Sequence, residues 1–365
     1  MLCAVSTIGR HEMNEKMIGL VKTSSGEGNM ELQELPVPEP KAGEVQISIA
    51  ATGICGSDLH IFHSDIALAM RPPVITGHEF SGVVSKIGEG VENVKVGDRV
   101  SAITSFKTCG ICINCKSGKT NICQHKKLIG YWYDGAFANY IVIPEANVQI
   151  LPDNVSFHEG AVLEPLCCAI EATIELTRVK PEDTVVVMGP GLIGQLTAQL
   201  AQLCGGRVIL IGTNKDQQRL ELALSLGIHH TLNLETADVN RYISDFTNGS
   251  GVDIVFECSG APAAARQGLQ LLRRGGQYTQ VGLFGKPIDI DFEQIAYKEA
   301  KVTGSLGQNW LNWNLAIKLL KNKRIQILPL VSEVLPLDRW KEGFNNFEKG
   351  LGTKILLEPV SSLSR

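Results

Sequence analysis

The spacing of hydrophobic and polar positions divides the chain into two unlike regions. Up to about residue 150, short runs rich in apolar and β-branched residues are separated by glycine and proline. These runs cover residues 17–23, 44–54, 80–91, 97–103 and 138–144. Regularly spaced short strands bounded by turn residues predict a compact, mostly antiparallel β domain. Residues 1–16, which are more polar, are predicted to form an N-terminal extension.

The pattern changes after about residue 160. Apolar runs at 184–189, 207–213, 253–260 and 277–283 alternate with helical periodicity at 192–205, 216–227 and 263–275. Fully apolar strands that alternate with amphipathic helices predict βαβ units on a parallel sheet. A further helix is predicted over 313–325. A last strand over 352–359 could rejoin the first domain and make it discontinuous.

Length and composition add limits to this two-domain pattern. The chain has 365 residues, more than one hydrophobic core usually holds, and its 44% hydrophobic content is that of a globular protein. The net charge of −4, without a basic block, argues against nucleic acid or an anionic membrane as a partner. No apolar run reaches the roughly 18 residues of a membrane span, and no secretory signal opens the chain. We therefore expect a cytoplasmic protein, in which disulfides are rare.

The stretch GPGLIG follows an apolar strand and opens a helix, as a dinucleotide-binding turn does. Gly189 would allow the tight turn, Gly191 would let the backbone approach a pyrophosphate, and Gly194 would let helix pack on strand. Leu192 and Ile193 begin the helix, whose N–H groups would face the phosphates. The alternative is a strand–helix turn that is merely tight.

The end of the next strand bears on the choice of dinucleotide. An NAD site normally carries a carboxylate there for the ribose hydroxyls, but this chain has Thr213. The missing carboxylate and the nearby cations Lys215 and Arg219 make NADP use plausible, and dual use possible. The alternative is that Lys215 and Arg219 belong to a solvated helix start capped by Asp216.

Four cysteines, Cys109, Cys112, Cys115 and Cys123, are separated by two, two and seven residues. This spacing lets one small lobe surround a metal ion with four thiolates, which is the usual structural zinc site. An iron–sulfur cluster is the rival, but its clustered motif has a three-residue gap and then proline after the last cysteine. Here the gap is seven residues and Gln124 follows, which favours zinc.

A second set of metal-ligand residues is spread along the chain: Cys55, His78, Glu79 and Glu164. One thiolate, one imidazole and one or two carboxylates, with a position left for water, describe a catalytic zinc site. Each residue alone has a structural interpretation. Cys55 would be a small buried hydrophobe, His78 a core histidine and Glu164 a charge at a helix N-terminus. Together, beside a dinucleotide fold, they favour the metal site.

These motifs resemble those of the zinc-containing alcohol dehydrogenases of the medium-chain dehydrogenase/reductase family. The stretch GICGSDLH, the stretch GHEFSGVVSKIGEGV followed by VGDRV, the four-cysteine lobe, the LEP element and GPGLIG stand in the family's order. The greatest similarity is to the polyol branch, which includes sorbitol, threonine 3- and sugar-alcohol-phosphate dehydrogenases. The resemblance implies an α/β fold with a GroES-like catalytic domain over 17–162 and 306–365 and a Rossmann domain over 163–305. It also implies homodimers or homotetramers with the active site between the domains.

The resemblance assigns roles to individual residues. Cys55, His78 and Glu79 would occupy ligand positions of a catalytic zinc, and Glu164 would be a ligand or hold the metal-bound water. Ser57 and His60 match the proton-relay positions. The four cysteines of the lobe match the structural zinc site.

Two positions depart from the sorbitol dehydrogenase pattern. Ile61 follows the relay histidine where those enzymes have an aromatic residue, and Leu306 stands where they carry an arginine near the substrate. These differences argue against sorbitol itself.

The predicted reaction is the reversible oxidation of a secondary alcohol by zinc and NAD or NADP. The alcohol would be a polyol, a sugar alcohol or its phosphate, or an amino alcohol. A non-catalytic NAD(P)-binding redox sensor and a zinc-free quinone or enoyl reductase are the alternatives.

Overall fold

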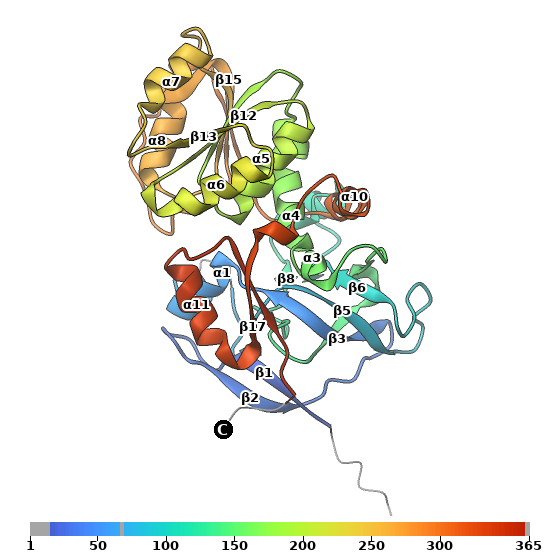
Figure 1. Ribbon diagram of the computed structural model, residues 1–365. Coiled ribbons are helices and arrows are strands. Elements are labelled where there is room, and N and C mark those ends of the chain that lie inside the picture. Colours follow the sequence, from blue (N-terminus) through green and yellow to red (C-terminus); the bar gives the residue numbers. More distant parts are fainter. Residues whose placement is uncertain (1–14, 66–68, 362–365) are drawn as a thin grey trace, which may run out of the picture.

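The computed structural model describes residues 15–65 and 69–361, and it stacks an α/β region on a β-rich region (Figure 1). The predicted N-terminal extension therefore lies almost wholly outside the described residues. Among those residues, no helix combines the length and hydrophobicity needed to cross a bilayer.

The β-rich region is organised around a seven-stranded sheet with the order β10-β6-β5-β3-β18-β17, in which β9 also pairs with β3. Its strands are β3 (Glu44–Gly53), β5 (Glu79–Ile87), β6 (Arg99–Ala102), β9 (Tyr140–Pro144), β10 (Val148–Ile150), β17 (Val331–Pro336) and β18 (Lys354–Glu358). All pairs except β17–β18 are antiparallel. The inward side chains of β3 and β5, such as Ile47 and Phe80, are fully buried and form the core of this sheet.

The C-terminal strand β18 pairs with β3, more than 300 positions earlier in the chain, through Leu356 and Gly53. A second sheet of three strands, β2 (Met30–Pro36), β1 (Lys16–Lys22) and β4 (Val74–Ile75), lies beside it. Helices α1 (Gly56–His63) and α11 (Trp340–Glu348) complete this region of the molecule.

The α/β region is a six-stranded sheet with the order β13-β12-β11-β14-β15-β16, and every neighbouring pair is parallel. Its strands are β11 (Thr184–Met188), β12 (Arg207–Gly212), β13 (His230–Asn233), β14 (Val252–Glu257), β15 (Leu272–Gln280) and β16 (Lys301–Gly304). Its helices are α5 (Leu192–Leu203), α6 (Gln217–Ser225), α7 (Val239–Phe246), α8 (Pro262–Leu271) and α9 (Glu293–Lys298). The predicted α/β fold class is thus confirmed.

Both faces of this parallel sheet are covered by helices, because both faces of its strands are apolar. On β11, Val186 packs toward α7 and α8, whereas Val185 and Val187 pack toward α5 and α6. This explains why β11 is a continuous apolar run rather than an alternating one. Helix α8 ends at Leu271, four residues earlier than the pattern predicts, because β15 begins directly after it.

Helices α3 (Phe157–Ala161), α4 (Leu163–Ile170) and α10 (Trp310–Lys321) join the two regions, and α4 continues into a π-helical segment, Glu171–Thr177. Trp313 is fully buried in a core that also contains Leu166 of α4, Leu200 of α5 and Leu356 of β18. One hydrophobic core therefore extends across the junction and fixes the wall on which Glu164 lies.

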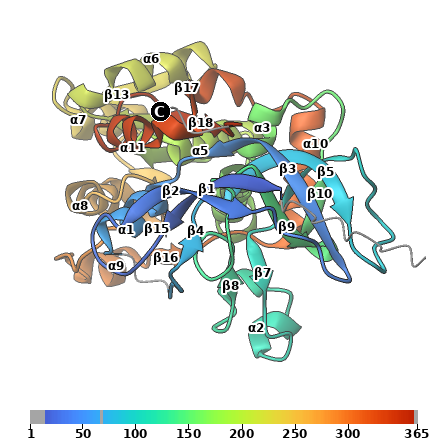
Figure 2. The same ribbon diagram turned by 90° about the horizontal axis from the view of Figure 1, so that it is seen from below.

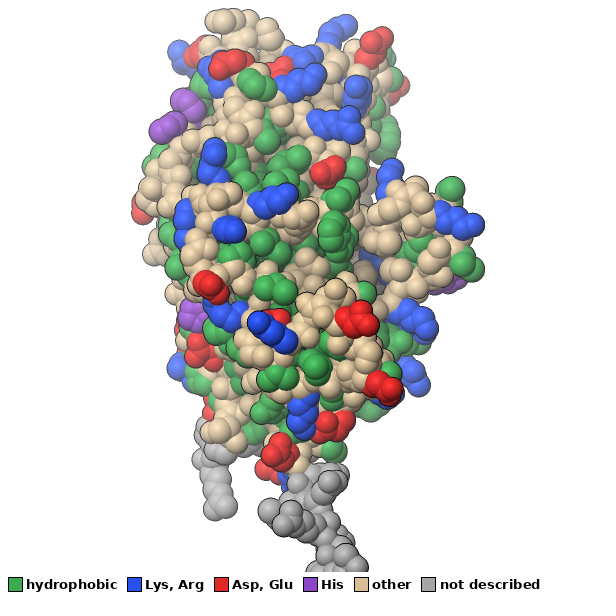
Figure 3. Space-filling model, turned by 90° about the vertical axis from the view of Figure 1, so that its right-hand side faces the viewer, with side chains coloured by type: hydrophobic (Ala, Val, Ile, Leu, Met, Phe, Trp, Pro, Cys, Tyr) green, Lys and Arg blue, Asp and Glu red, His purple; other side chains and the backbone are tan. Residues whose placement is uncertain are grey.

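The four-cysteine segment forms a lobe that projects from the body (Figure 2). It contains β7 (Ser105–Lys107), α2 (Ile113–Lys116), a 3₁₀ turn at Thr120–Ile122 and β8 (Lys127–Leu128). In the space-filling view the lobe stands off the body, and basic and acidic side chains are mixed over the rest of that face (Figure 3).

Candidate active site

A cleft of about 560 Å³ lies between the two regions. The β-rich region contributes Cys55, Ser57, His78, Glu79 and Thr104, and the α/β region contributes Gly191, Leu192, Ile193, Arg219 and Ser259. Glu164 of α4 and the loop 305–308 close its inner end. Metal-ligand residues and the glycine-rich turn thus face one shared space.

The pairing of β3 with β5 brings three of the predicted metal ligands together. Gly53 lies opposite Glu79, so Cys55, two residues after β3, lies alongside His78 and Glu79 at the start of β5. One ligand atom from each of the three lies within 4.8 Å of the others. A thiolate, an imidazole and a carboxylate at this separation fit a zinc ion.

Asp58 orients His78. The Asp58 carboxylate accepts a hydrogen bond from the Cys55 N–H (2.9 Å), and its other oxygen lies 3.5 Å from His78 Nδ1. The second ring nitrogen, Nε2, lies 3.4 Å from the Ser57 hydroxyl. Burial lowers the pKa of His78, but Tyr131, Asp58 and Cys55 favour a positive charge there and raise it well above its ordinary value. The same surroundings favour a divalent cation.

Glu79 has a second partner that the sequence pattern does not indicate. Its carboxylate forms a buried ion pair with Lys354 of β18, whose ammonium also donates to the Ile54 carbonyl (2.7 Å). A Cβ at Gly53 would overlap this pair, so the glycine makes room for it. Glu79 therefore shares its carboxylate between the metal-ligand group and Lys354.

Glu164 is buried at the inner end of the cleft. Gln308 Nε2 donates to it (3.3 Å) and to the Thr104 hydroxyl (2.9 Å), and the Cys168 thiol lies 3.5 Å away. Burial raises the pKa of Glu164. Gln308 is 3% exposed, and its Oε1 has no hydrogen-bond partner among the described residues. That oxygen is an acceptor available to a ligand in the cleft.

The two predicted relay residues lie on α1, one turn apart. Ser57 lines the cleft beside His78. His60 is hydrogen-bonded through Nδ1 to Asp65 (2.9 Å), and its side chain is 34% exposed. Within the described chain no hydrogen bond joins Ser57 to His60, so any proton transfer between them needs a bound group in between.

The four cysteines of the lobe surround one point, with their sulfurs within 4.8 Å of one another. All nine cysteines in the described ranges of the chain are free. Backbone N–H groups of Cys112 and Ile111 lower the pKa of Cys109 to about 6, whereas burial and neighbouring sulfurs raise the pKa of Cys115 to about 11. Four sulfurs at this separation, with the pKa of Cys109 lowered, fit a structural zinc site.

The glycine-rich turn has the local geometry of a phosphate-binding turn. Gly189 has φ of 98°, which favours glycine, and a Cβ at Gly194 would overlap the Gly189 carbonyl. Gly191 has φ of −66°, and no atom lies within 4 Å of where its Cβ would stand. The first and third glycines are thus required by the fold, while the second leaves open space at the start of α5.

The structure separates the two cations predicted to meet a 2′-phosphate. The Asp216 carboxylate accepts hydrogen bonds from the backbone N–H and the hydroxyl of Thr213. It also forms an ion pair with Arg219 (2.9 Å). The Arg219 guanidinium also donates to the Gly350 and Gly352 carbonyls. These carbonyls belong to the β-rich region, whereas Arg219 belongs to the α/β region. Arg219 therefore makes four hydrogen bonds within the protein, and Lys215 is the exposed cation of the two.

Comparison with known proteins places the chain in a family. Residues 41–153 match the alcohol dehydrogenase GroES-like domain, and residues 193–322 match the zinc-binding dehydrogenase family. A sorbitol dehydrogenase of Halalkalibacterium halodurans is 41% identical over 94% of this chain and 100% of its own. A D-arabitol-phosphate dehydrogenase of Enterococcus avium is 39% identical over 95% and 98%. A zinc-binding dehydrogenase of Sinorhizobium meliloti bound to NADP has a TM-score of 0.87 at 30% identity, with coverage of 94% and 100%.

These matches define a zinc-binding dehydrogenase with a GroES-like domain. The chain belongs to the zinc-containing medium-chain dehydrogenase/reductase family, in its polyol dehydrogenase branch. The predicted family and its cofactors, Zn²⁺ and NAD(P), are thereby confirmed.

The turn gives a first prediction. Gly191→Ala should leave the melting temperature unchanged, because its Cβ meets no atom, but should weaken NAD(P)H binding about tenfold or more by blocking the pyrophosphate. Gly194→Ala should instead destabilise the protein by about 1–3 kcal/mol through overpacking. Thermal denaturation and NADH or NADPH fluorescence titration separate the two effects. Normal dinucleotide binding by Gly191→Ala would contradict this assignment.

The cations give a second prediction. Lys215→Ala should raise the KM for NADP about fivefold and leave that for NAD unchanged, because an exposed ammonium adds a modest interaction with a 2′-phosphate. Arg219→Ala should lower stability by about 1–2 kcal/mol, since carbonyls and a carboxylate lose their donor. Steady-state kinetics with both dinucleotides and thermal melts measure these changes. An equal rise in both KM values for Lys215→Ala would remove Lys215 from the 2′-phosphate site.

Proposed function

We propose that the protein reversibly oxidises a secondary alcohol of a polyol, sugar alcohol, sugar-alcohol phosphate or amino alcohol to a ketone with NAD(P). The observation that carries this proposal is that Cys55, His78 and Glu79 share one cleft with the turn at Gly189–Gly194. A metal-ligand group and a dinucleotide site that face each other suit hydride transfer from a metal-polarised alcohol.

Cys55 and His78 would hold the catalytic zinc, with Glu79 or Glu164 as the carboxylate nearby. When bound, zinc supplies Lewis-acid polarisation of the alcohol oxygen, and the nicotinamide accepts the hydride. The protein orients His78 through Asp58 and pairs Glu79 with Lys354. Four lobe cysteines would hold the structural zinc away from the reacting atoms.

Ser57 is the proton acceptor in this scheme, because its hydroxyl lies in the cleft beside His78. His60 carries the proton onward to solvent. Its Nδ1 faces Asp65, so its other ring nitrogen remains available as an acceptor. The exposed position of His60 suits the solvent end of such a relay.

A substrate with several hydroxyl groups fits the inner end of the cleft. The unpaired Gln308 Oε1 would accept a hydrogen bond from a second hydroxyl, and such an acceptor is costly to leave buried and unpaired. Leu306, in place of the arginine of sorbitol dehydrogenases, lines the same cleft. The sorbitol and D-arabitol-phosphate dehydrogenase relatives support a polyol or its phosphate.

We propose dual use of NAD and NADP, with Lys215 as the cation near a 2′-phosphate. The NADP-bound neighbour supports NADP use, whereas the engagement of Arg219 limits the preference.

We also propose a homodimer or homotetramer in the cytoplasm. The sheet ends at β16, and Phe292, Tyr297 and Val302 on or next to α9 and β16 are exposed by 73%, 70% and 48%. Exposed apolar residues along an open sheet edge favour pairing with another subunit.

Two other functions are less well supported. A redox sensor that binds a dinucleotide without catalysis would not need the metal-ligand group formed by Cys55, His78 and Glu79. A zinc-free quinone or enoyl reductase gives no reason for that group or for the four-cysteine lobe.

A matched pair of cysteine variants tests the two metal sites. Cys55→Ser should lower the zinc content from about two to about one per chain and abolish alcohol oxidation, while NADH still binds. Cys112→Ser should also remove one zinc but should lower the melting temperature, because a structural metal contributes folding free energy. Metal analysis measures the zinc content, thermal melts measure the stability, and NADH titration measures dinucleotide binding. Full turnover by Cys55→Ser would refute the catalytic metal site.

Gln308 tests substrate recognition. Gln308→Met, which keeps the length but removes the amide, should lower kcat/KM for the preferred polyol about 10- to 100-fold, mainly through KM. Gln270→Met, at an exposed position on α8, is the matched control and should change neither constant. Equal kinetics for Gln308→Met and the wild type would show that the amide oxygen does not contact the substrate.

A further inference from the structure

We propose that the substrate carries a phosphate group and that Lys126 binds it on the wall of the cleft. This inference rests on the proposed function and narrows it to polyol monophosphates. Lys126 lies between Cys123 and β8, is half-buried, and lines the cleft together with Glu164 and Leu306.

The hydrogen bonding of Lys126 is incomplete. Among the described residues its ammonium group donates one hydrogen bond, to the Asn121 carbonyl at 2.5 Å. No ion pair joins it to any residue that the structure describes. An ammonium group has three donors, so two remain for a ligand.

Three other buried or half-buried lysines of this protein donate to two or more oxygens each. Lys22 donates to the carbonyls of Gly26, Gly28 and Phe62, Lys298 to those of Leu269, Gln270 and Leu272, and Lys354 to the Ile54 carbonyl and Glu79. Partial burial lowers the pKa of Lys126, against an opposing effect of Cys168, Cys123 and Glu164. A half-buried cation with free donors at a substrate cleft is suited to an anionic ligand.

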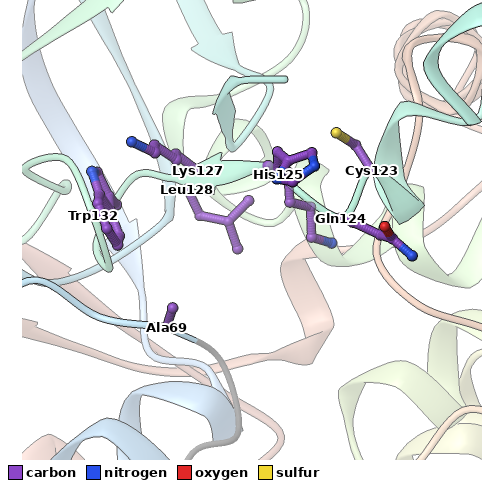
Figure 4. Close-up of a pocket in the computed structure, with 8 residues that line it drawn as sticks. Ala69, Cys123, Gln124, His125, Lys127, Leu128 and Trp132 are labelled. Atoms are coloured by element: carbon purple, nitrogen blue, oxygen red, sulfur yellow. The ribbon is translucent and has the colours of Figure 1, made fainter. Parts of the chain in front are cut away.

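The pocket on the other side of Lys126 has no acidic side chain among its described lining residues. A second pocket of about 410 Å³ adjoins the cleft and shares Lys126 and Leu128 with it. Its other described lining residues are Ala69, Cys123, Gln124, His125, Lys127 and Trp132, none of them acidic (Figure 4). The Lys127 ammonium lies over the Trp132 ring, 4.3 Å from its centre. Lys126 and Lys127 thus lie on the side of this pocket, whereas Glu164 faces Lys126 from the cleft.

Asn121 fixes Lys126 relative to the reacting end of the cleft. Its backbone carbonyl accepts from Lys126, and its side-chain amide donates to the Leu306 carbonyl (3.0 Å). Leu306 belongs to the loop that also carries Gln308. The cation is thus connected through Asn121 to the loop that carries the hydroxyl acceptor, which suits a substrate that has both a phosphate and hydroxyl groups.

Phosphate is favoured over carboxylate by its chemistry. It carries a charge of about −1.5 to −2 and three acceptor oxygens, which match a point charge with free donors. A carboxylate, as in threonine, would bind Lys126 more weakly than a phosphate does. The kinetic test therefore includes L-threonine.

The test compares matched substrates with the zinc-loaded enzyme. D-arabitol is paired with D-arabitol 5-phosphate and sorbitol with sorbitol 6-phosphate, and L-threonine is the carboxylate probe. The wild type should show a kcat/KM at least about tenfold higher for a phosphorylated member than for its partner. Lys126→Gln should lower that value about 10- to 100-fold, mainly through KM, and leave the unphosphorylated partner unchanged.

Two variants control for folding and charge. Lys126→Arg should retain part of the preference for phosphate. Lys116→Gln removes an exposed lysine from the same lobe and should behave as the wild type. Calorimetric titration of the enzyme–NADH complex with sorbitol 6-phosphate and with sorbitol measures the same preference without turnover.

The possible failures are distinguishable. Equal use of both members of each pair, preference for L-threonine, or an equal loss for both members in Lys126→Gln would overturn the phosphate site and leave the dehydrogenase proposal intact. If no alcohol is oxidised, the proposed function fails. In that case the calorimetric titration tests whether Lys126 binds phosphate. Equal binding of sorbitol and sorbitol 6-phosphate would overturn the phosphate site.

Discussion

The antiparallel pairing of β3 with β5, extended by β18 on the other side of β3, is the constraint on which the rest of the site depends. It places Gly53 opposite Glu79 and so brings Cys55 and His78 to one point. The same sheet inserts Lys354 beside Glu79 from the far end of the chain. A buried pair of this kind is destabilising when one partner is lost, so the metal-ligand group and the closure of the sheet depend on each other.

Much of the fold follows from the sequence because the apolar pattern of the central elements is strong. β11, α5, β12 and α6 are buried on both sides or amphipathic, and their bounds agree with the pattern to within a few residues. β13 and β16 lie at the two edges of the sheet, where a short strand needs few apolar residues, and the pattern predicts neither. The short helices α7, α9 and α11 also have no prediction; α7 and α11 are amphipathic, but they span only eight and nine residues.

The candidate ligands could be found from the sequence, because their residue types and the family motifs identify them. Their partners could not. Lys354 reaches Glu79 from 275 positions away, and Arg219 is held by carbonyls of residues 350 and 352. Such contacts depend on tertiary pairing, and a backbone carbonyl leaves no signature in the residue types. Asp58 is an exception, since a carboxylate three residues after Cys55 at a helix start is a recognisable capping arrangement.

The four-cysteine lobe lies closer to catalysis than a remote structural clamp would. Asn121, two residues before Cys123, supports both Lys126 and the loop at Leu306. Any change in the packing of the lobe would therefore reach the loop at Leu306 through Asn121, although no reacting atom had changed.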